Sequence, residues 1–316
     1  MKTSFLSWFL LILLSLVWGS SFILMKRGLE AFTSEQVAAL RIVIAFLFLF
    51  PLLVKHYKVN LKKNWKGLII MGVFGNLIPA FLFTKAETGI SSALAGMLNA
   101  LTPIFAILVG MIFFKTSTSR NQIIGVVIGL LGALLLVSFD KSNSQSSNNN
   151  WFALMVAGAT LCYAISVNGI KRYLSEVNSI TASVWSFTII GSITLVFPIL
   201  QNLIFGKPDE LNLWEDFFYR LRVNPLAWES LGFVCILAIV GSAISVILFN
   251  VLIKKSTAIF ASSCTYLIPV VAVMWGTLDG EKVVVFQLLA ILIILSGIWL
   301  INKKNLSKEV SSQKEV

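Results

Sequence analysis

One arginine stands inside an otherwise apolar run of this chain. Arg41 lies about six residues into the run 36–54, which corresponds to roughly 9 Å along a helix. Its planar guanidinium carries N–H donors that match a carboxylate or a phosphate. A charge inside a bilayer is costly and usually faces a cavity or a partner. Arg41 is therefore a candidate anchor for an acidic ligand group, and the alternatives are a side chain that reaches the interface or pairs with Glu35 or Glu87.

An aromatic residue beside small polar groups is the second candidate. Trp18 is followed by Gly-Ser-Ser, so Ser21 lies about one helical turn further along the run 4–25. Trp18 is too deep in this run to be an interfacial anchor, which leaves a packed core or the wall of a binding cavity as its surroundings. Tyr163 occupies the corresponding position in a later run and has the same two interpretations.

Polar side chains and prolines recur together in several other runs. Proline frees the carbonyl four residues earlier, which a membrane tolerates where that group meets a cavity or a hydroxyl. Small-residue stripes of this kind also serve as helix-packing faces, and both interpretations stay open. The candidates for cavity lining are Asn76, Asn99, Trp185 and Tyr266, and the candidates for helix breaks or gating points are Pro79, Pro103 and Pro269.

No Asp or Glu lies in the middle of an apolar run. Glu87, Asp140 and Glu281 all stand near run ends. Proton-coupled carriers commonly use a buried carboxylate, so this pattern favours a facilitator or an exchanger, or a coupling group that the sequence does not reveal. The chain also lacks clustered nucleophiles, histidines and carboxylates at catalytic or metal-binding spacing. We therefore expect no enzyme, no metal site and no cofactor.

Composition identifies the elements that must position these candidates as membrane helices. Hydrophobic residues make up 57% of the 316 positions and charged residues only 12%, whereas a soluble domain has about 25% charged residues. Continuous apolar runs of about 20 residues favour helices over barrel strands. We predict an all-α integral membrane protein with ten transmembrane helices, at 4–25, 36–54, 66–84, 90–113, 120–139, 151–170, 180–203, 229–252, 257–277 and 283–301.

The net charge of +11 is distributed unevenly between the loops. The N-terminus, every second loop and the C-terminal tail hold sixteen of the 25 basic residues, and the opposite loops hold eight. The positive-inside rule then places both termini in the cytoplasm and the chain in the plasma (inner) membrane. The charge thus orients the chain in a lipid bilayer and gives no indication of nucleic acid binding. We expect a monomer or a weak homo-oligomer.

The two halves of the chain repeat each other. Offsets of 145 residues near the start and 166 residues later on relate the matching positions, and Arg41 aligns with Ser186, so the charge belongs to one half only. Each half has five predicted spans, which forces equivalent segments to enter from opposite sides as inverted repeats, with a site near the midplane. The matched pairs include Ser21 with Ser166, Gly75 with Gly241, Phe83 with Phe249, and Pro103 with Pro269.

Polar segments divide the chain further. Residues 141–150 form a low-complexity stretch that predicts a flexible linker between a first repeat at 1–140 and a second at 151–302, with a cytoplasmic tail at 303–316. The segment 204–228 is an insertion in the second repeat. Asn212 followed by Glu215 has the pattern of a capping box, and apolar side chains follow at helical spacing. We predict a short amphipathic helix at the outer interface, with a gate over a cavity as the alternative.

Several short motifs carry a family resemblance. The segments 16–22 (LVWGSSF), 39–41 (ALR), 101–105 (LTPIF) and 279–281 (DGE) resemble, in order and spacing, EamA-type proteins of the drug/metabolite transporter superfamily. The resemblance covers nearly the whole chain and implies ten helices in two repeats, both termini inside, and movement of small metabolites. The chain departs from the family at Phe114-Lys115, where Gly-Glu is frequent, so this turn is not expected to be duplicated.

The combined expectation is a secondary transporter that works by alternating access. Arg41 and the aromatic candidates favour a small organic metabolite with an acidic group and an apolar part, such as an amino acid or a related compound. Export is the preferred direction by analogy alone. Nucleobase-like, vitamin-like or amphiphilic toxic compounds are alternative substrates, and a non-transporting scaffold or receptor is the alternative from another class. A channel is disfavoured because rings of like charge and a filter-like loop are missing.

Overall fold

The described part of the chain is entirely helical in the computed structural model, which describes residues 5–115, 118–138, 149–205, 211–255 and 264–312. The first half contains α1 (Phe5–Leu29), α2 (Ser34–Leu49), η1 (Phe50–Leu52), α3 (Leu53–His56), α4 (Leu61–Gly72), η2 (Val73–Leu77), α5 (Ile78–Ala86), α6 (Ser92–Leu98), η3 (Asn99–Leu101), α7 (Thr102–Phe113) and α8 (Arg120–Ser138). The second half contains α9 (Asn149–Tyr173), α10 (Ser179–Phe205), α11 (Leu213–Val223), α12 (Ala227–Ala238), η4 (Ile239–Ile244), α13 (Ser245–Lys255), α15 (Cys264–Leu278) and α16 (Val285–Ser312).

Each predicted span coincides with a helix or with a short series of helices. Within the described residues, eight segments are long and apolar enough to cross a bilayer, and Cys264–Leu278 and Val285–Ile301 are two shorter apolar helices. The beginning of the predicted span 257–277 and most of the predicted linker 141–150 lie outside the described residues. The predicted tail begins inside α16, which continues to Ser312. The fold class predicted from composition is therefore confirmed.

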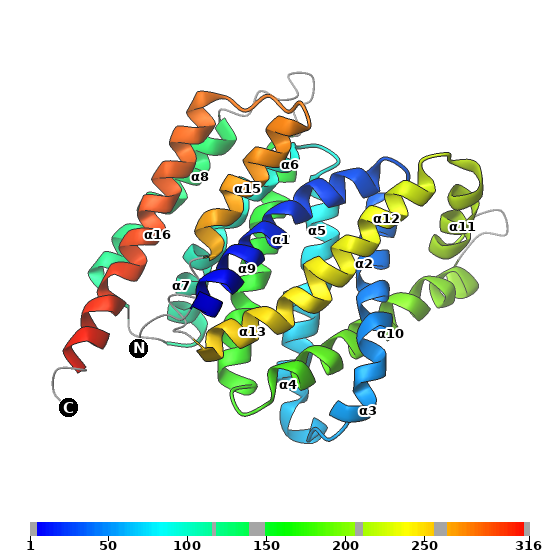
Figure 1. The fold of residues 1–316 in the computed structure, drawn as a ribbon, viewed down its shortest axis with the longest axis horizontal. Coiled ribbons are helices and arrows are strands. Elements are labelled where there is room, and N and C mark those ends of the chain that lie inside the picture. Colours follow the sequence, from blue (N-terminus) through cyan, green and yellow to red (C-terminus); the bar gives the residue numbers. More distant parts are fainter. Residues whose placement is uncertain (1–4, 116–117, 139–148, 206–210, 256–263, 313–316) are drawn as a thin grey trace.

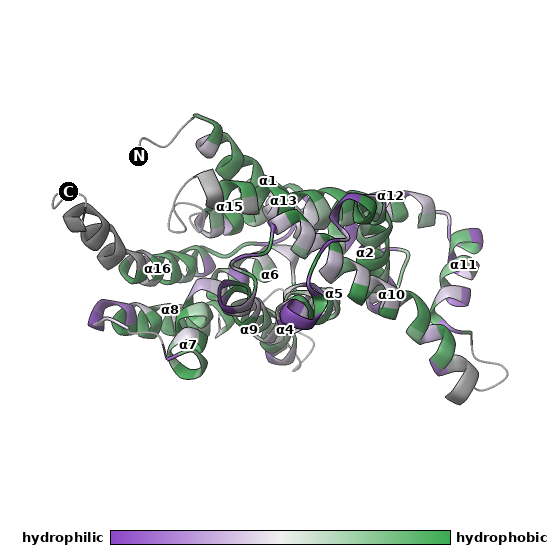
Figure 2. Ribbon diagram, turned by 90° about the horizontal axis from the view of Figure 1, so that it is seen from below, coloured by the Kyte–Doolittle hydropathy of each residue, from purple (hydrophilic) through white to green (hydrophobic). Residues whose placement is uncertain are grey.

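The helices form two layers. In Figure 2, α1, α12, α13 and α15 lie on one side and α4, α5, α7 and α9 on the other, with α8 and α16 together at one edge and α11 near the opposite edge. Successive spans alternate in direction (Figure 1). We call the end that contains α3 and the start of α1 the α3 end, and the opposite end, which contains α11 and the loop 279–284, the α11 end.

Equivalent helices of the two halves make equivalent contacts across the interface. α1 packs against α12 and α15, and α9, its counterpart, packs against α4 and α7. The contacts recur at single residues. A Cβ atom added to Gly75 would lie 2.5 Å from Ser166 Oγ, and one added to Gly241 would lie 3.1 Å from Ser21 Oγ. Because both partners belong to matched pairs, these contacts are related by the pseudo-two-fold symmetry of inverted repeats.

Two helices widen at matching positions. The π-helical segments η2 and η4 begin at Val73 and Ile239, which are 166 residues apart. A π turn shifts the backbone hydrogen bonds from i−4 to i−5 and often marks a functional site. Both segments lie in the interior of their spans, Leu61–Ala86 and Ala227–Phe249. The symmetry of the sequence thus extends to a local distortion of the backbone.

The last helices of the two halves pack against each other. A Cβ atom added to Gly125 would lie 2.5 Å from the Gly297 carbonyl, and one added to Gly297 would lie 2.5 Å from the Gly125 carbonyl. Such a close approach requires glycine on both helices. Gly129 and Gly132 also contact other helices, through Ile104 and Ile294. These α8 glycines are therefore packing residues.

The insertion contains the predicted helix. Asn212 accepts hydrogen bonds from the Trp214 and Glu215 amides, and the Glu215 carboxylate accepts one from the Asn212 amide, which completes the capping box. α11 contacts α2, where Gln36 Nε2 donates to the Leu213 carbonyl at 3.3 Å. Phe217 is buried with its ring centroid 5.3 Å from that of Phe32. α11 therefore packs against the start of α2 and the loop that precedes it.

Candidate functional site

Arg41 faces the interface between the two halves. Its Nε donates a hydrogen bond of 2.8 Å to Ser242 Oγ, in the π segment of the second half, and Nη1 lies 3.8 Å from Met25 Sδ. Within the described residues no carboxylate lies within ion-pairing distance of Arg41, and Glu35 pairs with Lys85 at 3.4 Å instead. The guanidinium therefore keeps donors and a full charge that no carboxylate of the described chain neutralises, as an anion-binding site requires.

Two aromatic pairs flank this position, and they are symmetry-related. The rings of Trp18 and Phe249 have centroids 5.1 Å apart, and those of Tyr163 and Phe83 are stacked at 5.9 Å. Each pair joins one residue of the first half with one of the second. The two pairs are related by symmetry because Trp18 matches Tyr163 and Phe83 matches Phe249. The Tyr163 hydroxyl interacts electrostatically with Arg41. The structure thus places Tyr163 next to Arg41, whereas Trp18 binds Ser245, three residues from the serine that binds Arg41.

Polar side chains satisfy the backbone of the π segments. Asn76 Nδ2 donates to the Met71 carbonyl, five residues earlier, at 3.1 Å. Ser242, its counterpart in the second half, donates to the Leu237 carbonyl, also five residues earlier, at 3.4 Å. Each side chain caps a carbonyl that the π turn leaves displaced. In the structure Asn76 thus holds a backbone carbonyl, and its assignment to a cavity wall remains a prediction.

Two of the three prolines follow a change of helix type. Pro103 is the second residue of α7, which follows η3, and Thr102 Oγ1 donates at 2.9 Å to the Asn99 carbonyl, which proline frees. Pro79 follows η2 in the same manner. Pro269 differs, because α15 continues from Cys264 to Leu278 across it. The helix break predicted at Pro269 is thus wrong for the described part of this helix, since a membrane helix continues through proline where neighbouring groups satisfy the freed carbonyl.

Two predicted site residues lie apart from Arg41. Trp185 Nε1 donates to the His56 carbonyl at 3.1 Å, and the ring packs among Leu68 and Leu174 towards the α3 end. Tyr266 Oη donates to the Ile298 carbonyl at 3.4 Å, which joins α15 to α16. Both side chains are half-buried and make structural hydrogen bonds. Their assignment to substrate binding remains a prediction.

Two serines outside the predicted set of site residues, Ser242 in η4 and Ser245 at the start of α13, contact members of that set. Ser242 binds Arg41, and Ser245 Oγ accepts a hydrogen bond of 3.0 Å from Trp18 Nε1. Both serines match first-half candidates, Asn76 and Pro79, at the offset of 166 residues. The internal repeat therefore contained the signal, although serine in a membrane helix is too common to be singled out by type alone.

A group of charged residues joins the two halves at the α11 end. Glu281 accepts hydrogen bonds from Lys26 Nζ at 2.7 Å and from the first two backbone amides of α6 at 3.0 Å each. Asp279 pairs with Lys26 at 2.6 Å and also with Arg27. Glu281 thus caps the N-terminus of α6 with a full charge. We call this group the Glu281 cluster, and it consists of Lys26, Arg27, Ser92, Asp279 and Glu281.

The electrostatics of the Glu281 cluster favour the ionised carboxylate. Burial by itself would raise the pKa of Glu281, but the hydrogen bonds from Lys26 and from the α6 amides outweigh it and hold the pKa below its ordinary value near 4.5. The Glu281 side chain is only 8% exposed. The cluster is therefore a partly buried, charge-assisted connection and not a loose surface ion pair.

No equivalent of this cluster is found among the described residues of the α3 end. Lys115 corresponds to Glu281 and Lys171 corresponds to Lys26, so two exposed cations stand where a carboxylate and its partner stand at the other end. The turn itself is partly repeated, because Gly280 has φ 81° and Lys115 has φ 50°. The expectation that the turn is not duplicated is thus wrong for the left-handed backbone, which recurs one position later, and correct for the side chains.

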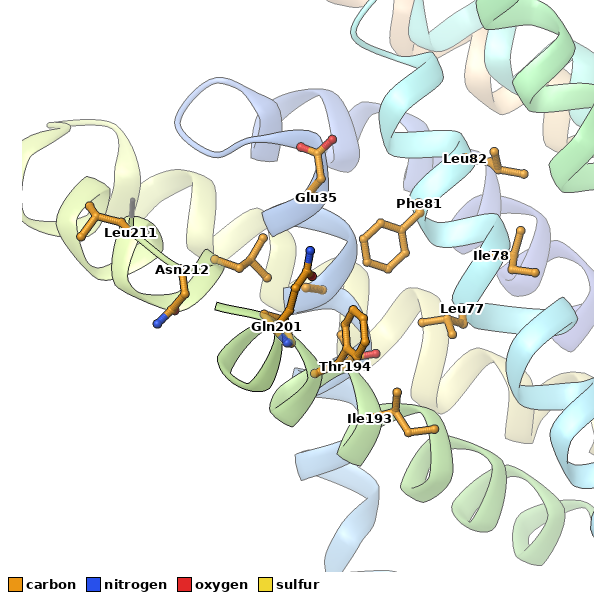
Figure 3. Close-up of a pocket in the computed structure, with 14 residues that line it drawn as sticks. Glu35, Leu77, Ile78, Phe81, Leu82, Ile193, Thr194, Gln201, Leu211 and Asn212 are labelled. Atoms are coloured by element: carbon orange, nitrogen blue, oxygen red, sulfur yellow. The ribbon is translucent and has the colours of Figure 1, made fainter. Parts of the chain in front are cut away.

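An apolar groove of about 760 Å³ lies between α2, α5 and α10 near the start of α11 (Figure 3). Glu35, Phe81 and Gln201 are among the residues that line it. Ala39 also lines the groove, and Arg41, two residues further, is turned about 200° around the helix. The groove and the Arg41 site therefore lie on opposite faces of α2.

Two inverted five-helix repeats with a cation and aromatic pairs at their interface are the architecture of a membrane transporter. More particularly, the chain belongs to the EamA-like transporter family, whose family model matches residues 6–138 and 150–303. This family is part of the drug/metabolite transporter superfamily. The expected class of protein is confirmed, and the match covers both repeats.

Relatives of similar length support this assignment. An uncharacterized transporter of Archaeoglobus fulgidus is 24% identical over 94% of this chain and 99% of its own length. The uncharacterized inner membrane transporter YedA of Escherichia coli K12 is 25% identical over 91% of this chain and 88% of its own. A protein of Salmonella typhimurium named "probable amino-acid metabolite efflux pump" is 23% identical over 92% and 93%. A crystal structure with 15% identity matches the fold with a TM-score of 0.59, covering 93% of this chain and 95% of that chain.

Proposed function

We propose that this transporter exports small organic metabolites with an acidic group, amino acids or related compounds among them, by alternating access. The observation that carries the proposal is the unneutralised guanidinium of Arg41 beside the aromatic pairs at the repeat interface. A planar fork of N–H donors binds a carboxylate, and the rings contact the apolar part of the substrate. The name of the Salmonella relative, an efflux pump for amino-acid metabolites, is consistent with this substrate class and direction.

The proposal includes an orientation. The α3 end carries the basic loop with Lys55, Lys58, Lys62, Lys63 and Lys66. The positive-inside rule assigns this end to the cytoplasm, together with both termini, and assigns the α11 end to the outside of the plasma membrane. A C-terminal fusion to a reporter that is active only in the cytoplasm should give a signal. A signal from a C-terminal fusion to a reporter that is active only outside contradicts the assignment.

Counterflow in proteoliposomes tests the transport function directly. Proteoliposomes that contain the purified protein are loaded with one compound, which should exchange in a saturable way against members of a panel of amino acids, nucleobases and cationic dyes. Exchange of anionic or zwitterionic amino acids supports the proposal, and exchange of dyes alone redirects it to amphiphilic compounds. A protein that is folded by light scattering and circular dichroism yet exchanges nothing in the panel contradicts it.

Substitutions of Arg41 test the anchor. Arg41→Ala removes hydrogen bonds to a charged group, each worth about 1.5–3 kcal/mol, so the KM for acidic substrates should rise about 10- to 150-fold. Arg41→Lys keeps the positive charge but not the planar pair of N–H donors, so its KM should lie between those of the unsubstituted protein and Arg41→Ala. Arg222→Ala, which removes an exposed arginine of α11, is the matched control and should leave KM unchanged. Equal affinity of Arg41→Ala and the unsubstituted protein for every acidic substrate refutes the anchor role.

A further inference from the structure

A buried carboxylate without a partner lies next to the Glu281 cluster. Glu87 is the C-terminal capping residue of α5 and is only 8% exposed. Both of its carboxylate oxygens are buried, and neither has a hydrogen-bond partner among the described residues. The sequence places Glu87 at the end of a span, where a solvated carboxylate is expected, so its burial is a property that only the fold reveals.

Charged groups of both signs face Glu87 from three other elements. Lys26 on α1 and Arg41 on α2 favour its ionised form, whereas Glu281 disfavours it. Lys26 is already bound to Asp279 and Glu281, at 2.6 and 2.7 Å. On its own helix the nearest cation, Lys85, is exposed and paired with Glu35. The neighbouring stretch 151–161 of α9 contains no charged residue.

The surroundings of Glu87 favour the neutral form of its carboxyl group. Burial is the largest influence, and together with the negative charge of Glu281 it raises the pKa of Glu87 well above its ordinary value near 4.5. An ionised carboxylate that loses water without gaining a hydrogen bond or an ion pair costs far more than a neutral one. Water can reach the carboxyl group only when the elements that enclose it separate.

We propose that Glu87 binds a proton, and that this bound proton favours the conformation in which the Glu281 cluster is joined. In that conformation Glu87 is neutral and enclosed between α1, α2, α5 and the loop 279–284. Separation of the cluster admits water and releases the proton to the α11 end. The inference rests on the proposed transport function only in its consequence, since it makes opening of that end, and therefore exchange, dependent on pH.

A buried reporter next to Glu87 measures opening without reference to any substrate. Ile90 is 5% exposed and Thr88, two residues earlier, is exposed. Ile90→Cys in lipid nanodiscs should react slowly with a hydrophilic maleimide, and Thr88→Cys should react at the full rate of an accessible thiol. The ratio of the two rates removes the pH dependence of thiol chemistry and isolates opening of the α11 end. The protein's own cysteines (Cys162, Cys235 and Cys264) are replaced by serine or alanine in all variants.

The expected result is a logarithm of the normalised rate that rises linearly with pH and that requires Glu87. Above the ordinary carboxyl pKa near 4.5 the normalised rate of Ile90→Cys should rise with pH, by up to about tenfold per pH unit where Glu87 is protonated in the closed form, because opening releases one proton. Glu281 stays ionised over this range, so it does not contribute. With Glu87→Gln, a permanently neutral isostere, the normalised rate should be low and independent of pH. Glu35 is a half-exposed carboxylate at the same end, so the Glu35→Gln variant should keep the pH dependence of the normalised rate.

Three outcomes overturn the inference. These are a normalised rate that is independent of pH with Glu87 present, the same slope with Glu87→Gln, and loss of the slope with Glu35→Gln. Infrared spectra give a second measurement, since a protonated carboxyl C=O band that is absent from Glu87→Gln supports the proposal and its absence from the unsubstituted protein contradicts it. Failure of counterflow with every compound, with the slope preserved, refutes the proposed function and leaves the proton site intact.

Discussion

Replacement of Glu281 by glutamine is the most informative single perturbation of this fold. The carboxylate binds Lys26 Nζ at 2.7 Å, Ser92 Oγ at 2.9 Å and two α6 amides at 3.0 Å. Glutamine keeps the volume and one acceptor oxygen but loses the charge. Lys26 retains Asp279 at 2.6 Å, so no cation is left without a partner.

The magnitude follows from these contacts. Hydrogen bonds to a charged group contribute about 1.5–3 kcal/mol each, and the glutamine oxygen replaces part of them, which gives a net loss of about 2 kcal/mol. The cluster joins the two repeats at the α11 end only, so the loss falls on the conformation in which that end is closed. A shift of 2 kcal/mol changes the ratio of closed to open molecules by about 30-fold.

Alkylation of Ile90→Cys measures this shift. Its rate, normalised to Thr88→Cys, should increase about 30-fold with Glu281→Gln at neutral pH, as long as the closed form predominates at the outset. Glu176→Gln is the control, because Glu176 pairs with Lys63 at 2.7 Å on the surface, where an ion pair contributes little. An unchanged normalised rate in folded Glu281→Gln protein would refute the idea that this cluster holds the two repeats together.

Two further predictions concern stability. Gly19→Ala should lower the free energy of unfolding in detergent by about 1–3 kcal/mol, because its Cβ would lie 2.5 Å from Val271 Cβ, whereas Gly232→Ala, with open space around it, should be neutral or stabilising in thermal denaturation. Acid should weaken the Glu281 cluster. Because the pKa of Glu281 is lower in the folded protein than its ordinary value near 4.5, the ionised carboxylate stabilises the fold fully above pH 4.5. This stabilisation is lost as the pH falls through the lower pKa of the folded state. Unfolding midpoints that fall equally in the unsubstituted protein and in Glu281→Gln below pH 4.5 would contradict this assignment.

The sequence predicts the spans and the repeat well because both depend on patterns that a single chain displays. Apolar runs define spans by length, and the offset of 166 residues pairs Gly75 with Gly241, which the structure places in equivalent contacts with Ser166 and Ser21. The capping box of α11 is local and is likewise predicted correctly.

Properties that arise from three-dimensional neighbours were not predicted. Glu87 is buried, and the charges that act on it lie on α1, α2 and the loop 279–284, which are distant in sequence. Trp185 has the residue type of a binding wall, yet its partner is the His56 carbonyl, which no local pattern indicates. The π segments leave a regular apolar composition unchanged, so their positions were visible only in the backbone.

The reciprocal Gly–Ser contacts have a consequence for how this chain can be divided. Ser21 of the first repeat packs against Gly241 of the second, and Ser166 of the second packs against Gly75 of the first, so neither repeat covers its own inner face. The largest hydrophobic cluster likewise combines residues of both halves, such as Phe22 and Ala272. A single repeat is therefore not an independent folding unit, and the folding unit is the pair of repeats. Each half, synthesised alone, would leave an apolar and polar surface exposed, and two separately encoded halves would have to be made together to form a stable protein.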